Sequence, residues 1–510
     1  MRGIVSLLLF LSSVSLSADE KLGTISFPNS GRPEAQAAFV RGVAALHSFW
    51  YEEAAEAFRE AQRIDPGFAL ACWGEAMTYN HPIWLEVDPG AGRAALAKAS
   101  AARTPTPREQ AYLDAVAALY DEKGDKDSRD AEYEKRMARL AAAYPDDAEA
   151  QAFHALAILG LMRPGEPDAR KQIRAAAILE PLLVTHPSHP GVLHYMIHAY
   201  DDPVHAPLGL RAARRYARVA PAAHHALHMP SHIFLQLGMW EEAAASNEMA
   251  FAASKAWVAR RNLTRDKHDL HSLSWLQYVY LQQGRFADAK KLLDETAGDT
   301  SRERSTRRRM GARYALETGD ASVLGDEGPS GDGEGHACGA MQHRGGSGTE
   351  EVLFARGVIA ARRGNIVEAK RALARLSAAA PSSSAYEPEI GKVMARSLEA
   401  LIAFAETRRD EALRLAAEAV RMEEALGAPS GPPDTLQPAH EIYGELLLES
   451  GRPKEALEQF RRSLLRTPNR ARSLEGAVAA AAACDDAGAE AVHRAALAAV
   501  RKDRPRSERP

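Results

Sequence analysis

Cysteine is scarce in this chain, and its scarcity limits the classes of protein that the sequence can encode. The 510 residues include three cysteines, Cys72, Cys338 and Cys484, which are far apart and odd in number. They provide neither a disulfide framework nor a CxxC metal motif. Aromatic residues are also few, at 6% of the chain, beside 46% apolar and 26% charged residues. This composition, rich in Ala, Leu, Arg and Glu, favours a soluble helical protein.

Common catalytic and nucleotide-binding motifs are missing as well. The sequence has no HExxH, no GxSxG, no Walker A motif and no GxGxxG in a Rossmann context. The formal net charge is −4, so no excess of positive charge predicts a nucleic-acid partner. Beyond the N-terminus, no apolar run is long enough to span a membrane. A protein or peptide partner, or a small ligand, is expected instead.

The first 18 residues have the composition of a secretory signal peptide. Arg2 gives a basic start, residues 4–11 are apolar, and residues 15–18 offer small side chains for cleavage. The apolar run is short for a membrane span. The sequence therefore predicts an exported protein, located in the periplasm or outside the cell.

Small and aromatic residues recur at fixed positions along the chain, in successive units of similar length. In residues 35–68, a glycine stands at position 8, alanines at 20 and 27, a phenylalanine at 24 and a proline at 32. Much of this pattern returns at 350–381 and at 437–468. The pattern resembles the tetratricopeptide repeat (TPR) family, whose unit is a helix–turn–helix of about 34 residues. The resemblance implies an all-α fold, a right-handed solenoid of stacked helix pairs, and a role in protein interaction.

Composition divides the predicted solenoid into two blocks. Between Gly325 and Gly348, glycine is by far the most frequent residue, and it is accompanied by proline, serine and aspartate. Such a segment cannot bury enough apolar surface to fold. We predict a signal peptide at 1–18, an N-terminal TPR block at 19–320, a flexible linker at 321–349, a C-terminal TPR block at 350–500 and a disordered tail at 501–510.

Four histidines form two matched pairs. His194 and His198, like His228 and His232, have i,i+4 spacing, which places both imidazoles on one face of a helix. The second pair follows the first by one full repeat length, so the two pairs occupy equivalent sites in successive repeats. Neutral imidazole binds zinc and copper, and pairs on adjacent helices can converge on one ion. The sequence predicts such a zinc or copper site, although Pro230 favours a helix start that would turn His228 off the regular face.

The TPR resemblance also implies which side chains line the concave groove. In that family, positions 2, 5, 9, 12 and 13 of the first helix commonly point into it. By this rule, seven further polar side chains become candidate ligand-binding residues beside the predicted metal site. They are His47, His81, Asp201, Asp202, His225, His271 and Tyr278. The two aspartates are close enough in register to orient a ligating imidazole or to complete its shell.

These residues leave several functions open. In the first, an exported TPR solenoid holds a partner or ligand in its histidine-rich groove, together with a transition-metal ion. The alternative is a metal-dependent enzyme, either a hydrolase or a copper oxidoreductase, with Asp201 as the candidate base. The histidines can also hydrogen-bond between helices or face solvent without any ion. Four protein ligands on an ion indicate a closed site, whereas three leave a position for catalysis.

Overall fold

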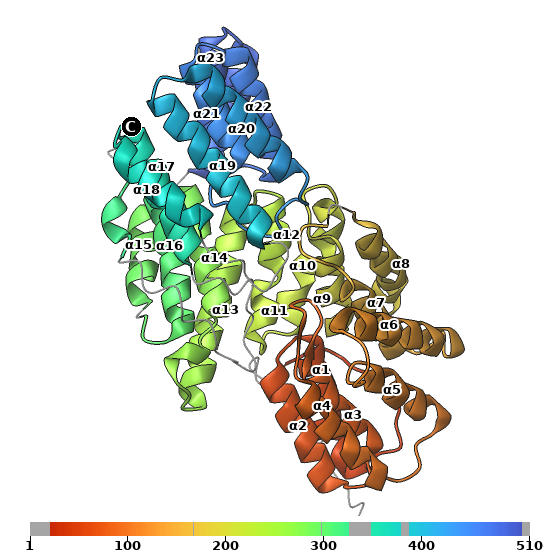
Figure 1. The fold of residues 1–510 in the computed structure, drawn as a ribbon. Coiled ribbons are helices and arrows are strands. Elements are labelled where there is room, and N and C mark those ends of the chain that lie inside the picture. Colours follow the sequence, from red (N-terminus) through yellow and green to blue (C-terminus); the bar gives the residue numbers. More distant parts are fainter. Residues whose placement is uncertain (1–20, 167, 297, 326–347, 379–386, 502–510) are drawn as a thin grey trace, which may run out of the picture.

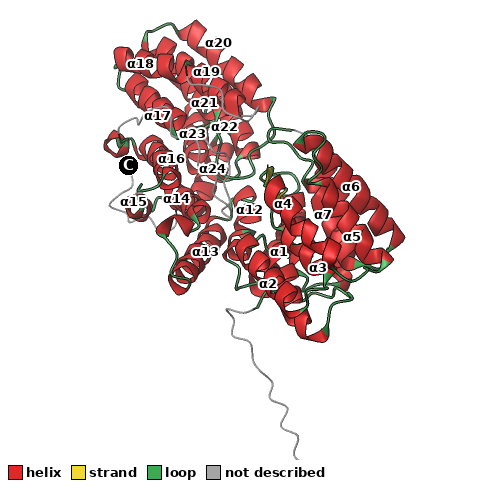
Figure 2. Ribbon diagram, turned by 60° about the horizontal axis from the view of Figure 1, so that its bottom comes forward, coloured by secondary structure: helices red, strands yellow, loops and turns green. Residues whose placement is uncertain are grey.

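A computed structural model describes residues 21–166, 168–296, 298–325, 348–378 and 387–501. This part of the chain is almost entirely helical (Figure 1, Figure 2). Its only strands among the described residues are β1 (Asn80–His81) and β2 (Glu86–Val87), which pair in antiparallel fashion. This short sheet departs from the prediction of helices alone, but it is confined to the connection that follows α3.

The N-terminal helices follow one another mostly as antiparallel pairs (Figure 1). Short 3-10 turns accompany them. The elements are η2 (Pro33–Ala35), α1 (Gln36–His47), α2 (Tyr51–Ile64), α3 (Ala69–Met77), α4 (Pro89–Ala97), η3 (Lys98–Ala101), α5 (Pro107–Ala118), α6 (Lys126–Ala143), α7 (Ala148–Leu159), α8 (Arg170–Thr185), α9 (Pro190–Ala199), α10 (Ala206–Val219), α11 (His224–His228), α12 (Pro230–Gln236), α13 (Trp240–Arg260), η4 (Arg265–Lys267), α14 (Leu270–Gln283), α15 (Phe286–Glu295), α16 (Ser301–Thr318) and η5 (Ala321–Val323).

The C-terminal helices continue the array as further antiparallel pairs. They are α17 (Thr349–Arg362), α18 (Ile366–Ser377), α19 (Glu387–Ala405), α20 (Arg409–Glu424), α21 (Ala439–Glu449), α22 (Pro453–Arg466), α23 (Ala471–Ala483) and α24 (Ala487–Val500). The described chain is therefore an all-α solenoid of TPR-type helix pairs, as the repeat pattern predicts.

The first repeat shows how the sequence pattern produces this packing. Phe58 of α2 is fully buried and fills the space between α1 and α3. Glycine makes that space available, because a Cβ atom at Gly42 would lie 2.8 Å from the Phe58 ring and one at Gly74 would lie 2.3 Å from it. Phe460 repeats the arrangement in the C-terminal block, where a Cβ at Gly476 would lie 2.3 Å from its ring. One aromatic side chain thus joins three successive helices.

Three of the predicted segments lie wholly or largely outside the described residues. These are the signal peptide at 1–18, the linker at 321–349 and the tail at 501–510. Of the linker, residues 321–325 and 348–349 are described, and they include η5 and the first residue of α17. Of the tail, residue 501 is described. Their predicted flexibility stays a prediction.

The two blocks also contact each other directly. Arg470, which precedes α23, is fully buried and donates hydrogen bonds to Glu441 at 2.6 Å and to Glu317 of α16 at 2.6 Å. The Arg470 guanidinium also donates to the Tyr278 hydroxyl at 3.3 Å. The side chain of Gln282 accepts from the first backbone N–H of α23 at 3.0 Å. The end of the chain therefore packs back onto α14 and α16 of the N-terminal block.

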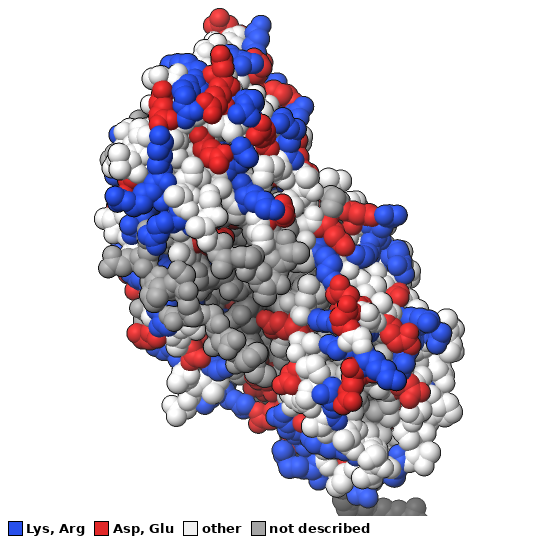
Figure 3. Space-filling model, in the orientation of Figure 1, with Lys and Arg blue, Asp and Glu red and all other residues white. Residues whose placement is uncertain are grey.

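The surface carries mixed charge. On the face shown in Figure 3, Lys and Arg side chains are interspersed with Asp and Glu over both blocks. This mixture agrees with the small net charge of the sequence. Within the described ranges, no helix has the length and apolar character needed to cross a membrane.

The contact between Phe58 and α3 generates the first prediction. Gly74→Ala should lower the free energy of unfolding by about 1–3 kcal/mol, because the added methyl group overlaps the Phe58 ring. Gly90→Ala is the matched control, since the nearest atom to a Cβ there is 3.5 Å away. Urea denaturation of both variants measures the difference. Equal stability of the two variants would contradict the packing argument.

Candidate metal centre

Six histidines from four helices of the N-terminal block form two groups of three. All six are buried, with exposed fractions between 0% and 9%. They are His194 and His198 on α9, His225 and His228 on α11, His232 on α12 and His271 on α14. The sequence places these side chains in an open concave groove. The structure instead encloses them between packed helices.

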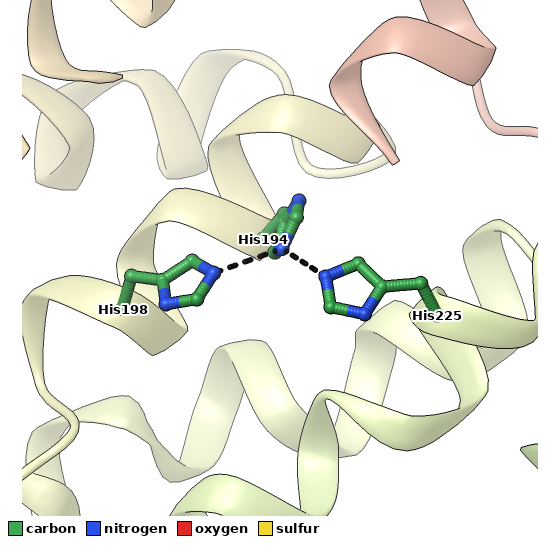
Figure 4. A group of neighbouring side chains, drawn as sticks. All are labelled: His194, His198 and His225. Carbon is green, nitrogen blue, oxygen red and sulfur yellow. Dashed lines mark hydrogen bonds between the residues drawn. The ribbon is translucent and has the colours of Figure 1, made fainter. Parts of the chain in front are cut away.

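The first trio consists of His194, His198 and His225. The Nε2 atom of His194 lies 3.1 Å from Nε2 of His198 and 3.0 Å from Nε2 of His225. Figure 4 shows the rings of His198 and His225 pointing at His194 from opposite sides. Three ring nitrogens from two helices therefore converge on one region.

The second trio consists of His228, His232 and His271. Nε2 of His228 lies 3.1 Å from Nε2 of His232. Each of the three residues offers one ring nitrogen, and these three nitrogens all lie within 4.8 Å of one another. The ring centroids of His228 and His271 are 4.6 Å apart.

The four paired histidines thus fall into two groups of three, and each predicted pair gains a third histidine from the next repeat. That the four bind one ion stays a prediction. Pro230 does interrupt the helix, because α11 ends at His228 and α12 begins at Pro230. The interruption leaves His228 and His232 in contact all the same.

Both trios follow one positional rule. Each combines positions 5 and 9 of one repeat with position 2 of the next repeat. The repeat that begins at 190 provides His194 and His198, and the repeat that begins at 224 provides His225. The repeat that begins at 224 then provides His228 and His232, and the repeat that begins at 270 provides His271. The arrangement is thus a property of the junction between repeats.

Buried acceptors hold the other ring nitrogen, Nδ1, of three of these histidines. The acceptors are a backbone carbonyl at the end of α1, a side-chain amide on α13 and a carboxylate that follows α9. The distances are 2.7 Å from His194 to the carbonyl of His47, 2.6 Å from His228 to Oδ1 of Asn247, and 2.6 Å from His232 to Oδ2 of Asp201.

These acceptors determine where the imidazole proton resides. Carbonyl and carboxylate oxygens only accept hydrogen bonds, so Nδ1 of His194 and of His232 carries the proton. Asn247 donates its amide to the carbonyl of Ala243 at 2.8 Å, which turns its oxygen toward His228. Nδ1 of His228 therefore carries the proton as well. In the neutral form of each ring, Nε2 carries a lone pair and no proton.

Burial keeps two of these rings neutral at ordinary pH. It is the main cause that lowers the pKa of His194 to about 3 and the pKa of His228 to about 3. Burial also lowers the pKa of His225 well below its usual value. Neutral imidazole is the form that binds metal ions.

The nitrogen separations suit coordination to a common ion. Zinc–imidazole bonds of about 2.0–2.1 Å separate two ligating nitrogens by about 2.8–3.4 Å when the angle between the bonds is about 90–109°. The measured separations of 3.0 and 3.1 Å lie within this interval. These contacting pairs therefore have the spacing of two nitrogens bound to one ion.

Aromatic rings enclose the two trios. The ring of Phe49 lies 4.3 Å from that of His194 and stacks on His225 at 5.7 Å. Trp275 lies 4.4 Å from His232. A Cβ atom at Gly431, in the C-terminal block, would lie 2.5 Å from Trp275. Residues far apart in the sequence thus cover the two trios.

The two predicted aspartates have different roles. Asp201 accepts a hydrogen bond from His232 and another from Gln236 at 3.4 Å, so it orients a histidine as the sequence predicts. Asp202 instead accepts from the ring of His205 at 2.7 Å and from nearby backbone N–H groups. It belongs to the start of α10 and not to either trio.

Two other predicted residues lie away from both trios. His81 stacks on Tyr51 with ring centroids 3.9 Å apart and contacts the Glu86 carboxylate at 3.0 Å. The short β1–β2 pair holds it there. Tyr278 faces Arg470 at the contact between the two blocks. His81 and Tyr278 therefore belong to neither trio, and their role in binding a ligand stays a prediction.

His47 belongs to a third buried group, with Glu149 and His189. Nε2 of His47 lies 2.7 Å from one carboxylate oxygen of Glu149, and Nε2 of His189 lies 3.0 Å from the other. Nδ1 of His189 accepts from a backbone N–H of α9, and Nδ1 of His47 lies 2.8 Å from the Tyr195 hydroxyl. Hydrogen bonds alone account for this group. It fixes the end of α1, whose last carbonyl orients His194.

Sequence reasoning misses several of the supporting residues. Glu149 occupies position 2 of its repeat, the same position as His225 and His271. The rule that assigns certain repeat positions to the concave groove (the groove rule) could therefore have found it. Asn247 lies on a second helix, which the rule does not cover. Phe49 lies in a connection between helices and carries no motif.

The Asn247–His228 contact generates the second prediction. Asn247→Leu should lower the free energy of unfolding by about 1–3 kcal/mol, because a buried N–H of His228 then loses its acceptor. Adding His228→Phe removes that N–H. The loss of unfolding free energy in the double variant should therefore be smaller than the sum of the losses in the two single variants. A double-mutant cycle by chemical denaturation measures this coupling. Additive effects would show that the two side chains do not interact.

Comparison with known proteins identifies no relative by sequence: no protein-family model matches the chain, and no curated protein matches it. Several solved structures are similar in fold at low sequence identity. One is the APC/C hetero-tetramer Cut9–Hcn1 (13% identity, 90% of this chain, 78% of that chain, TM-score 0.35). A monomeric mutant of IFIT1 has 12% identity over 93% and 92% of the two chains, with a TM-score of 0.35. The P58(IPK) TPR domain has 14% identity over 89% and 99%, with a TM-score of 0.23. The helix pairs of this chain themselves define the TPR-type solenoid.

Proposed function

We propose that this protein binds two transition-metal ions, one at each histidine trio, and that the TPR-type solenoid is the scaffold that holds them. The contact between His228 and His232 carries this proposal. Both rings hold their proton on Nδ1, so two lone pairs face each other across 3.1 Å. Two lone pairs repel at that distance unless a cation lies between them.

A proton is the competing cation, and on His228 burial argues against it. Protonating His228 means burying a charge on a ring whose pKa is lowered to about 3 by burial. The first trio also has more nitrogen contacts than hydrogen bonds can satisfy. Nε2 of His194 has one lone pair but two nitrogen neighbours, so it can accept a hydrogen bond from one of them. A metal ion satisfies all three nitrogens at once.

The donor set supports zinc or copper. All six candidate ligands are imidazole nitrogens, with no carboxylate or thiolate among them. Calcium and magnesium prefer oxygen ligands, whereas imidazole suits zinc, copper and nickel. Asp201 behaves as an outer partner, because the carboxylate–histidine–metal arrangement fixes both the tautomer and the ring direction.

Three ligands on each ion leave a coordination position, which supports the enzyme alternative. Asp201 is a poor base for such an enzyme, since His232 and Gln236 already occupy its oxygens. A protein partner on the outer helices fits the solenoid equally well. The apolar N-terminus is the reason to propose export to the periplasm or beyond the cell.

Metal content tests the proposal most directly. Protein purified without chelator or nickel resin should contain two equivalents of zinc or copper by elemental analysis. His194→Ala and His232→Ala should each lower the content to one equivalent, and the double variant should contain none. His154→Ala is the control, because His154 pairs with Glu134 on α6 and lies in neither trio. Wild-type protein that takes up no metal would overturn the proposal.

The two adjacent aspartates provide a sharper test. Asp201→Asn should weaken metal binding at the second trio by about 10–100-fold, because the carboxylate no longer supports His232. Asp202→Asn should leave the affinity unchanged, since Asp202 contacts His205 instead. Competition with a chromophoric chelator gives both affinities. The same loss in both variants would assign the effect to general charge and not to the contact with His232.

A further inference from the structure

The two trios are close neighbours. The ring centroids of His198 and His232, which belong to different trios, are 6.0 Å apart. Those of His225 and His228 are 6.1 Å apart. By comparison, His232 and His271 of the same trio are separated by 6.3 Å. The nearest rings of different trios are therefore no farther apart than two rings within the second trio.

The same helix contributes to both trios. His225 and His228 stand three residues apart on α11, and each belongs to a different trio. The rings of these two residues are nearly parallel, at an interplanar angle of 25°. His198 and His232 occupy equivalent positions in successive repeats. The 6.0 Å between the ring centroids of His198 and His232 sets the scale of the distance between ions held by the two trios.

Charge distinguishes copper from zinc here. The six imidazoles bring no charge. The carboxylate of Asp201 accepts a hydrogen bond from His232, and the buried carboxylate of Asp269 interacts electrostatically with His228. Two divalent ions would bury four positive charges in this site, whereas two monovalent ions would bury two. The cost of burying an ion rises steeply with its charge. Copper has a stable monovalent state, but zinc has no redox chemistry.

We propose that the two trios together form one two-copper centre, in which the ions lie close enough to act as a pair. This inference rests on the metal binding proposed above and adds the identity of the metal and the coupling of the two sites. The centre is enclosed by Phe49 on one side and Trp275 on the other.

Electron paramagnetic resonance of the full chain loaded with two equivalents of Cu(II) tests the pairing. We expect a spectrum broadened by dipolar coupling, together with a half-field transition. His271→Ala should bind one copper and give the sharp spectrum of an isolated ion. His154→Ala should retain the coupled spectrum. If His271→Ala fails to fold, as circular dichroism would show, His232→Gln serves the same purpose.

Each outcome has a distinct meaning. Failure to bind two coppers, whether they are offered as Cu(I) under argon or as Cu(II) in air, would overturn the proposed metal binding itself. Two bound coppers with the sharp spectrum of isolated ions would leave metal binding intact and overturn the pairing. The choice of metal is tested by adding Cu(I) under argon to protein loaded with two equivalents of zinc. Release of both zinc ions is expected, and their retention would overturn the assignment to copper.

Discussion

The chemistry of the candidate site depends on the hydrogen bonds that hold the imidazole Nδ1 atoms. An imidazole in water exchanges freely between its two neutral tautomers, but a buried acceptor selects one of them. His194, His228 and His232 are fixed in this way by a carbonyl, an amide and a carboxylate. Each acceptor comes from a different part of the chain, so the packing of repeats determines which nitrogen keeps its lone pair.

The packing itself follows from a simple requirement: one helix pair cannot bury its apolar face without a neighbour. Phe58 satisfies the requirement by contacting the glycines of two different helices. The same regular stacking explains why there are two trios and not one. At both of these junctions, positions 5 and 9 of one repeat lie beside position 2 of the next repeat. Histidine at these positions in two successive junctions therefore produces two similar sites side by side.

The sequence predicts the solenoid and the residues of the cluster better than it predicts how they are grouped. The repeat spacing identifies the helix pairs and the four paired histidines, and the groove rule adds His225 and His271. Grouping depends on the direction in which each ring turns, and spacing does not contain that information. His81 and Tyr278 satisfy the same rule, yet a β-bridge and a distant arginine hold them elsewhere. Such partners cannot be read from the position of a residue within its repeat.

A loop of the C-terminal block contributes to the burial of the cluster. Gln236 donates one hydrogen bond to Asp201 and another, at 2.7 Å, to the carbonyl of Pro429. Gly431, two residues later, lies against Trp275. The loop before α21 is therefore linked through Gln236 to the carboxylate that orients His232, and it lies against the aromatic ring that covers His232. Any ligand that binds the folded chain alone stabilises it by mass action. An ion at the second trio would thus stabilise the contact between the two blocks, and that contact would in turn keep water away from the ion.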